Sequence, residues 1–203
     1  MNKNFKIFII LKIIFICFVS FKSYAENVES HKNKVTLGLD TAVVKIKVFS
    51  SHTCPHCANF HLDIIPKIKN KYVDSGKVQI IFIDFPLDQA AFNASKLLHC
   101  VEQKNQINFL DKIYKEQKSW TAASDLDGIN KNLKKIAKNL GISSLNFDQC
   151  LIDDSISDKI LNERIDAQKK YSITATPTII INEKKFEDSF TFENIAKKID
   201  KII

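Results

Sequence analysis

A helix flanked by two apolar strands near the start of the chain is the feature that most constrains its fold. Residues 43–49 (VVKIKVF) are rich in β-branched side chains, and residues 78–85 (VQIIFIDF) are apolar almost throughout, as in a strand buried on both faces. Between them, Pro55 favours a helix start and Gly76 favours a left-handed helix end. Strands joined in this way pair with a right-handed crossover, so we predict a βαβ unit.

The pattern changes after this unit. Residues 88–171 have helical spacing of apolar residues with almost no Gly or Pro, which predicts about five short helices. A strand at 178–181, a turn, a return strand at 185–187 and a helix at 191–202 follow. With a short first strand at 35–37, we predict an α/β fold in which an all-helical insertion separates a βαβ half from a ββα half.

The first 25 residues have the layout of a cleaved secretory signal. Three lysines, the last of them Lys12, precede an apolar run of nine residues at 13–21, and small residues lie at positions 23 and 25. An uncleaved anchor is disfavoured, because Lys12 leaves the apolar run shorter than the ~20 residues that a membrane span needs. We therefore expect a periplasmic mature protein. The expected segments are a signal peptide at 1–25, a first half at 26–87, the helical insertion at 88–171 and a second half at 172–203.

The net charge gives little support to a nucleic-acid partner. The chain carries 30 Lys+Arg against 23 Asp+Glu, but four of the lysines fall in the predicted signal peptide, which leaves an excess of three in the mature part. No basic block interleaved with aromatic residues occurs. Five cysteines in 203 residues are also too few for a small disulfide scaffold. We expect no nucleic-acid partner.

The sequence Cys54-Pro55-His56-Cys57 lies between the first long strand and its helix. A thiol in the first helical turn faces unpaired backbone N–H groups and the positive end of the helix dipole, which stabilise its thiolate. A protonated His56 adds positive charge nearby. These effects predict that Cys54 is the attacking and leaving sulfur and that Cys57, one turn further on, resolves a mixed disulfide.

Two other interpretations of this motif remain open from the residues alone. Cys54 and Cys57 could form a structural disulfide, although a two-residue loop at a helix start is strained and exposed, which favours reactivity. Zinc sites use the same cysteine spacing, and His52 and His61 could add ligands. Structural zinc sites usually draw on two such pairs, and the chain has no second one, so we expect no bound metal. We expect His61 to be a solvated helix residue.

A second motif, Ile173-Thr174-Ala175-Thr176-Pro177-Thr178, leads directly into the predicted strand at 178–181. Proline is awkward before a central strand, because it donates no hydrogen bond to the ladder. It is accommodated if the Thr176–Pro177 bond is cis and the loop faces the cysteine turn.

The two motifs and their context resemble the thioredoxin superfamily and, within it, the DsbA-like periplasmic thiol oxidases. The resemblance rests on CPHC at 54–57, Pro66 at a kink inside the helix, the helical insertion and the Thr176–Pro177 pair. It implies that Cys54 is the nucleophile and Cys57 the buried resolving cysteine. It also implies that Pro55 and His56 tune the redox potential, and that Thr176 and Pro177 line the groove for an extended substrate peptide.

The resemblance also implies partners and a cofactor requirement. The substrates would be reduced exported polypeptides, and a membrane protein of the DsbB type would reoxidise the enzyme. The redox-active disulfide Cys54–Cys57 would serve without another cofactor. Disulfide isomerases of the superfamily usually carry an N-terminal dimerisation domain, and only about ten residues separate Ala25 from the first strand. We therefore expect a monomeric oxidase, with an isomerase or reductase as the alternative.

One position departs from the family. Many members carry an acidic residue six positions before the first cysteine, which exchanges protons with the buried thiol. Val48 occupies that position here, next to Lys47. How Cys57 exchanges its proton is therefore left open, with water as one route.

Cys100 and Cys150 fall in two different predicted helices of the insertion. In an exported protein we expect them to form a structural disulfide, the alternative being two buried free thiols. We expect His99 to lie on the helix surface beside Cys100.

Overall fold

The computed structural model describes residues 34–203, so the predicted signal peptide at 1–25 lies outside the described residues. Within the described part of the chain, no helix combines the length and the apolar character that a membrane crossing requires.

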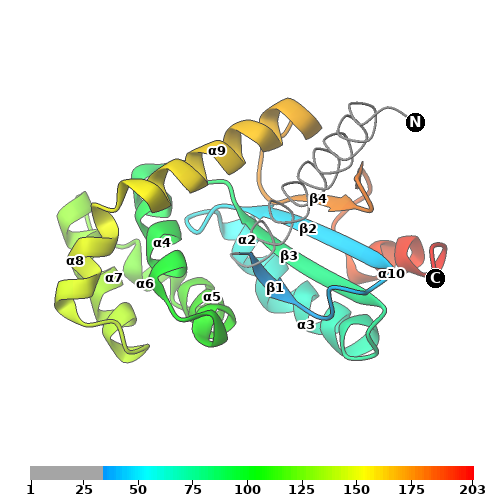
Figure 1. The fold of residues 1–203 in the computed structure, drawn as a ribbon, viewed down its shortest axis with the longest axis horizontal. Coiled ribbons are helices and arrows are strands. Elements are labelled where there is room, and N and C mark those ends of the chain that lie inside the picture. The colour runs from blue at the N-terminus through cyan, green and yellow to red at the C-terminus, as the bar shows by residue number, and fades with distance from the viewer. Residues whose placement is uncertain (1–33) are drawn as a thin grey trace, which may run out of the picture. The chain divides into compact units, whose positions relative to one another are not determined.

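A five-stranded mixed sheet forms the centre of the fold, in the order β1-β3-β2-β4-β5 (Figure 1). β2 and β3 are parallel, with Val48 opposite Phe82, and the other neighbours are antiparallel. The strands are β1 Val35–Leu37, β2 Val44–Ser50, β3 Val78–Asp84, β4 Thr178–Ile181 and β5 Lys184–Lys185. This is the predicted βαβ and ββα arrangement, and the fold class is confirmed.

The helical elements fall into a group after β2, a block between β3 and β4, and one helix at the end of the chain. The first group is α2 Pro55–Asn59, η1 Phe60–Ile64, α3 Ile65–Ile68 and η2 Lys69–Val73. The block is α4 Gln89–Cys100, η3 Gln103–Asn105, α5 Gln106–Lys115, α6 Gln117–Trp120, α7 Leu126–Asn139, α8 Ser144–Leu151 and α9 Asp154–Tyr171. The last helix is α10 Phe192–Asp200.

Strand alternation divides the sheet into two apolar faces, as the period of two requires. Val44, Ile46 and Val48 of β2 pack with the helical group after β2 and with α10. Phe49 and Ile180 belong to a second cluster on the other face, which includes residues of α9. The sheet is therefore covered on both faces, and its central strands are almost entirely apolar for that reason.

The helical block has its own core, which extends to the cysteine turn. Its aromatic side chains are deeply buried: Phe109, Trp120 and Phe147 are each at most 2% exposed. The same cluster of buried side chains includes Cys54 and Cys57. The active-site turn is thus packed between the sheet and the inserted helices.

The helical group after β2 is irregular. Two π-helical segments, 60–64 and 69–73, lie on either side of the short α-helix that begins at Ile65. Pro66 lies in the first turn of that α-helix, where its missing N–H is tolerated, and the wider π turn precedes it. Gly76 adopts φ +74°, the left-handed end that was predicted.

Two predicted details differ from the structure. The segment 88–171 contains six α-helices rather than about five short ones, and α9 alone has 18 residues. The length of α9 was hard to predict because its largely polar sequence has little apolar periodicity. The return strand is at Lys184–Lys185 rather than 185–187. Asn182 and Glu183 both adopt positive φ, which makes a two-residue hairpin turn and moves the register by one residue.

Candidate active site

The turn after β2 places Cys54 at the N-terminus of α2. The N–H of Cys54 donates to the carbonyl of Ser51 at 3.1 Å, and Cys54 itself is the N-cap residue. Its sulfur accepts a hydrogen bond from the N–H of Cys57 at 3.4 Å, where a serine or aspartate oxygen would commonly cap a helix. Negative charge on this sulfur is stabilised by that N–H and by the helix dipole.

The second predicted motif meets the first one. The Thr176–Pro177 peptide bond is cis, and the Cys54 thiol donates to the carbonyl oxygen of Thr176 at 3.4 Å. Thr178 donates from its hydroxyl to the carbonyl of Ala175 at 2.7 Å, which closes the loop before β4. The structure therefore brings together the residues predicted for catalysis and substrate binding.

The two cysteines differ in their surroundings. Cys54 is 8% exposed and Cys57 is 1% exposed, and both are free thiols. Burial raises the pKa of Cys57 to about 12, and polar contacts with Thr176 and with the Ser51 backbone lower it only in part. Cys57 therefore holds its proton over the whole range in which the protein would work, while the helix terminus stabilises negative charge on Cys54.

A groove of about 530 Å³ lies beside the turn and the proline loop. His56 contributes to it from the helix side, and Thr176 and Pro177 contribute from the loop side. Phe60 and Phe190 add aromatic surface. The groove is thus mainly apolar. The Thr176–Pro177 loop forms one of its sides.

Gln117 of α6 is a site residue that sequence reasoning missed. Its side-chain amide donates to the carbonyl oxygens of His52 at 2.7 Å and of Cys54 at 3.1 Å. A buried glutamine has no local sequence signature, because its partners lie 65 and 63 residues away. It fixes the backbone on both sides of Thr53.

Two of the histidine predictions are wrong. His61 is 4% exposed rather than solvated; its Nε2 lies 2.7 Å from a carboxylate oxygen of Asp111, and its ring packs 4.8 Å from that of Tyr114. His99 does not lie free on a helix surface, since its Nε2 lies 2.8 Å from an oxygen of the buried Asp84. In both cases a distant carboxylate supplies the partner that allows the imidazole to leave the solvent, fully for His61 and in part for His99.

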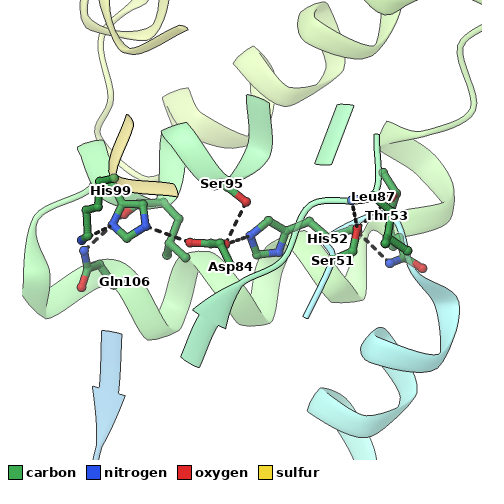
Figure 2. A network of polar contacts seen from close by, with 11 residues as sticks. Ser51, His52, Thr53, Asp84, Leu87, Ser95, His99 and Gln106 are labelled. Carbon is green, nitrogen blue, oxygen red and sulfur yellow. Dashed lines mark hydrogen bonds and ion pairs between the residues drawn. The ribbon is translucent and has the colours of Figure 1, made fainter. Parts of the chain in front are cut away.

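Val48, at the position where many family members have an acid, is 2% exposed and belongs to the apolar core. The buried acid of this region is instead Asp84, at the end of β3. It accepts hydrogen bonds from His52 at 2.9 Å, His99 at 2.8 Å and the Ser95 hydroxyl at 2.8 Å (Figure 2). Burial by itself would raise the pKa of Asp84, but the two histidines outweigh burial and hold it well below its usual range.

The remaining cysteines of the insertion form a second pair. Cys100 at the end of α4 and Cys150 in α8 are joined in a disulfide that spans 50 residues of sequence. Among residues 34–203, no cluster of three or more His, Cys, Asp or Glu side chains has the arrangement of a metal site.

A dithiol with one slightly exposed and one fully buried cysteine, at a helix N-terminus opposite a cis-proline loop, defines a thiol–disulfide redox protein. A family model described as Thioredoxin matches residues 30–201 of the chain. The chain therefore belongs to the thioredoxin family, and it is a disulfide oxidoreductase of the DsbA type, as the following similarities indicate.

Solved structures and curated proteins agree on this class. Alpha-DsbA1 of Wolbachia pipientis is 34% identical, with a TM-score of 0.73 over 84% of this chain and 91% of that one. Disulfide bond formation protein D of Bacillus subtilis is 26% identical over 85% of this chain and 78% of its own length. A Rickettsia bellii relative, named as a protein-disulfide oxidoreductase, is 28% identical over 90% of this chain. The chain spans 69% of that relative and 62% of its Rickettsia typhi counterpart.

Proposed function

We propose that the protein is an exported dithiol oxidase that donates the Cys54–Cys57 disulfide to reduced polypeptides in the periplasm. The observation that carries this proposal is the position of the Cys54 sulfur, which caps α2 and lies 3.4 Å from the carbonyl of Thr176 in the cis-proline loop. Stabilising a thiolate at this position stabilises the reduced enzyme, and so makes the disulfide a better oxidant.

The reaction proceeds in two exchanges. A substrate thiolate attacks the sulfur of Cys54; the substrate–Cys54 bond forms, the Cys54–Cys57 bond breaks, and the electron pair leaves on Cys57. The Cys57 thiolate takes up a proton, because burial raises its pKa to about 12. A second substrate thiolate then attacks the substrate sulfur of the mixed disulfide and releases Cys54 as a thiolate. The substrate is oxidised by two electrons and the enzyme is reduced by two.

The groove beside the turn supports an extended polypeptide as substrate. Its surface is mainly apolar, and Thr176 and Pro177 border it next to Cys54. An unfolded chain offers apolar side chains and free backbone groups that suit such a surface. His56, which also borders the groove, lies where it would tune the potential together with Pro55.

Turnover requires that the dithiol is oxidised again. We propose a membrane protein of the DsbB type for this step, on the strength of the similarity to DsbA proteins, and no cofactor other than the Cys54–Cys57 disulfide. Export is supported by the signal-like sequence of residues 1–25 and by the Cys100–Cys150 disulfide, a bond typical of oxidising compartments.

The test is a stoichiometric reaction of the oxidised protein with a reduced, denatured substrate that needs several disulfides. We expect two substrate thiols to disappear for each enzyme disulfide consumed, at a rate that far exceeds uncatalysed air oxidation. A parallel assay with a scrambled-disulfide substrate separates this activity from isomerisation. Rescue of the scrambled substrate without oxidation of the reduced one would overturn the proposal in favour of an isomerase or reductase.

A further inference from the structure

A second groove, of about 450 Å³, borders the active-site turn at Thr53 and has no role in the exchange steps. This Thr53 groove is lined by Thr53, by residues 88–90 around the start of α4, and by parts of the segment 121–129 that leads into α7. It shares no lining residue with the groove beside the proline loop, which His56 borders. The redox turn therefore contributes to two separate surfaces, one through Thr53 and one through His56.

Two carboxylates that line the Thr53 groove are held in place by hydrogen bonds. Asp88 is the N-cap of α4: one of its oxygens accepts from the N–H of Ala91 at 2.7 Å, and the other accepts from the Thr53 hydroxyl at 2.6 Å. Asp125 is the N-cap of α7 and accepts from the N–H of Gly128 at 2.7 Å. Both carboxylates thus present negative charge at fixed positions beside the turn.

The charge of these carboxylates is not neutralised by the part of the chain that the structure describes. Within residues 34–203, neither Asp88 nor Asp125 forms an ion pair, and no basic side chain lines the groove. Each helix terminus offers about half a positive charge, which is less than the full charge of the carboxylate that caps it. The groove therefore attracts cations, although basic residues outnumber acidic ones by 30 to 23 in the chain.

Apolar side chains line the same groove. Ala90, Leu126 and Ile129 contribute to it, and Leu126 is 38% exposed. The side-chain amide of Asn93 in α4 donates to that of Asn130 in α7 at 2.8 Å, so the two helices that wall the groove are tied together without a ligand. Apolar surface next to carboxylates suits lysine and arginine, whose side chains have an aliphatic stem and a cationic end.

The redox turn connects the Thr53 groove to the reacting sulfur. Thr53 immediately precedes Cys54, so their Cα atoms are about 3.8 Å apart. An extended polypeptide advances about 3.3 Å per residue. A substrate whose cysteine reacts at Cys54 can therefore place a side chain that is two or three residues away in this groove.

We propose that the Thr53 groove is a substrate subsite that favours reduced polypeptides with a basic residue two or three positions from the reacting cysteine. Asp88 and Asp125 are its specificity-determining residues. The inference rests on the proposed oxidase function and narrows its substrate class. The stem of the basic side chain packs on Leu126 and Ile129, and its cationic end lies between the two carboxylates. The groove beside the proline loop remains for an apolar part of the same substrate.

The test measures the oxidation of short reduced peptides that contain two cysteines and differ at one position. Lysine, glutamine or glutamate occupies a position two residues before the cysteine pair in one set and two residues after it in another. The oxidised wild type is compared with the double variant Asp88→Asn, Asp125→Asn. Asparagine caps a helix about as well as aspartate and carries no charge, so the double variant retains its helix caps. The matched control is Asp153→Asn, because Asp153 is the N-cap of α9 and lies outside the groove.

In at least one of the two sets, we expect the wild type to oxidise the lysine peptide roughly three- to tenfold faster than the glutamine peptide at low ionic strength, and the glutamate peptide more slowly. This range corresponds to the modest energy of exposed ion pairs, and added salt should reduce it. We expect the preference to fall within about twofold in the double variant and to persist in Asp153→Asn. An effect of lysine on the peptide thiol itself is common to all three enzymes and cancels in the comparison.

Equal lysine-to-glutamine ratios in the wild type and the double variant would overturn the inference, as would an equal loss of preference in Asp153→Asn. A wild-type dimer that the double variant does not form would also overturn it and would assign the groove to a second copy of the chain. If the double variant does not fold, NMR titration of the wild type with a lysine peptide whose cysteines are replaced by serine decides the question. We expect shifts at the amides of residues 88–91 and 125–129, and shifts confined to the groove beside the proline loop would refute the subsite.

The same peptides separate failure of the subsite from failure of the proposed function. A wild type that oxidises none of the peptides would overturn the oxidase assignment and the inference with it. A wild type that oxidises all of them at equal rates would overturn the subsite alone.

Discussion

The sulfur of Cys54 lies 3.4 Å from the carbonyl oxygen of Thr176, although 122 residues separate them in the sequence. A substrate sulfur that approaches Cys54 therefore passes the cis-proline loop, whose carbonyl is already in contact with the thiol. Cys57 is buried behind Cys54 and cannot receive a substrate directly, since it is only 1% exposed. This asymmetry supports the proposed roles of the two cysteines.

Substitution of either cysteine should separate those roles. We expect Cys54→Ala to abolish oxidation of a reduced polypeptide, because it removes the more exposed cysteine of the pair. In Cys57→Ala, Cys54 still exchanges with a substrate disulfide, but nothing in the turn resolves the product. Non-reducing electrophoresis should then show a persistent mixed disulfide with Cys57→Ala and none with Cys54→Ala. Mixed disulfides through Cys57 in Cys54→Ala would contradict the assignment.

The protonation of Cys57 should be visible in the pH dependence of stability. Burial raises its pKa from 9.0 to about 12 in the folded reduced protein, so between these values the folded state binds more protons than the unfolded state. The corresponding stability is complete below about pH 9 and is lost as the pH rises toward 12. Denaturant unfolding of the reduced protein should show this loss, and Cys57→Ala should show less of it. Parallel curves for the two proteins would argue against a raised pKa.

Asp84 should make the stability of the folded protein depend on pH in the acid range. Burial alone would raise its pKa, but hydrogen bonds with His52 and His99 hold it below its unfolded value. Its contribution is therefore present above about pH 4 and is lost as the pH falls. We expect Asp84→Asn to destabilise the protein by roughly 3 kcal/mol near neutral pH. The control is Asp74→Asn, which removes an exposed ion pair with Lys69 and should cost less than about 1 kcal/mol.

The disulfide of the insertion should contribute to stability but not to exchange. Closing a loop of 50 residues restricts the unfolded chain by about 4 kcal/mol on the entropy model. We expect the double variant Cys100→Ala, Cys150→Ala to lose up to that amount in denaturant unfolding. Its Cys54–Cys57 equilibrium with glutathione should remain within about twofold of the wild type. A large change in that equilibrium would show that the second disulfide reaches the active site.

Substitution of His56 should lower the redox potential of the Cys54–Cys57 disulfide. Its side chain borders the groove in the first turn of α2, where positive charge favours the Cys54 thiolate. We expect His56→Pro and His56→Tyr to make the disulfide severalfold less oxidising in the glutathione equilibrium, in keeping with the modest energy of charges near a helix terminus. An unchanged equilibrium in both variants would exclude a tuning role.

Local sequence patterns were sufficient to predict the sheet, the helical insertion and both halves of the cysteine–proline site. Strand period, the proline at the first helical position and the proline before β4 are signals that act within a few residues. They also located Val35–Leu37 and the end of β3 to within a residue.

The environments of His61 and His99 could not be predicted in this way. His61 and His99 stand in helical sequences in which an exposed imidazole is the ordinary expectation. Their environments depend on Asp111, 50 residues from His61, and on Asp84, 15 residues from His99 in another element. Only the tertiary structure shows that these carboxylates are within reach, and so the Asp84 cluster became visible only there.

The bridge that Gln117 makes to the carbonyls of His52 and Cys54 links the inserted helices to the redox turn itself. Trimming the chain to its sheet and flanking helices would thus remove a brace of the turn along with the added surface. A shortened protein of this kind would keep its CPHC sequence. Its cysteine turn would lack the two hydrogen bonds from Gln117 that hold the backbone in place. The insertion therefore supports the backbone of the redox turn directly.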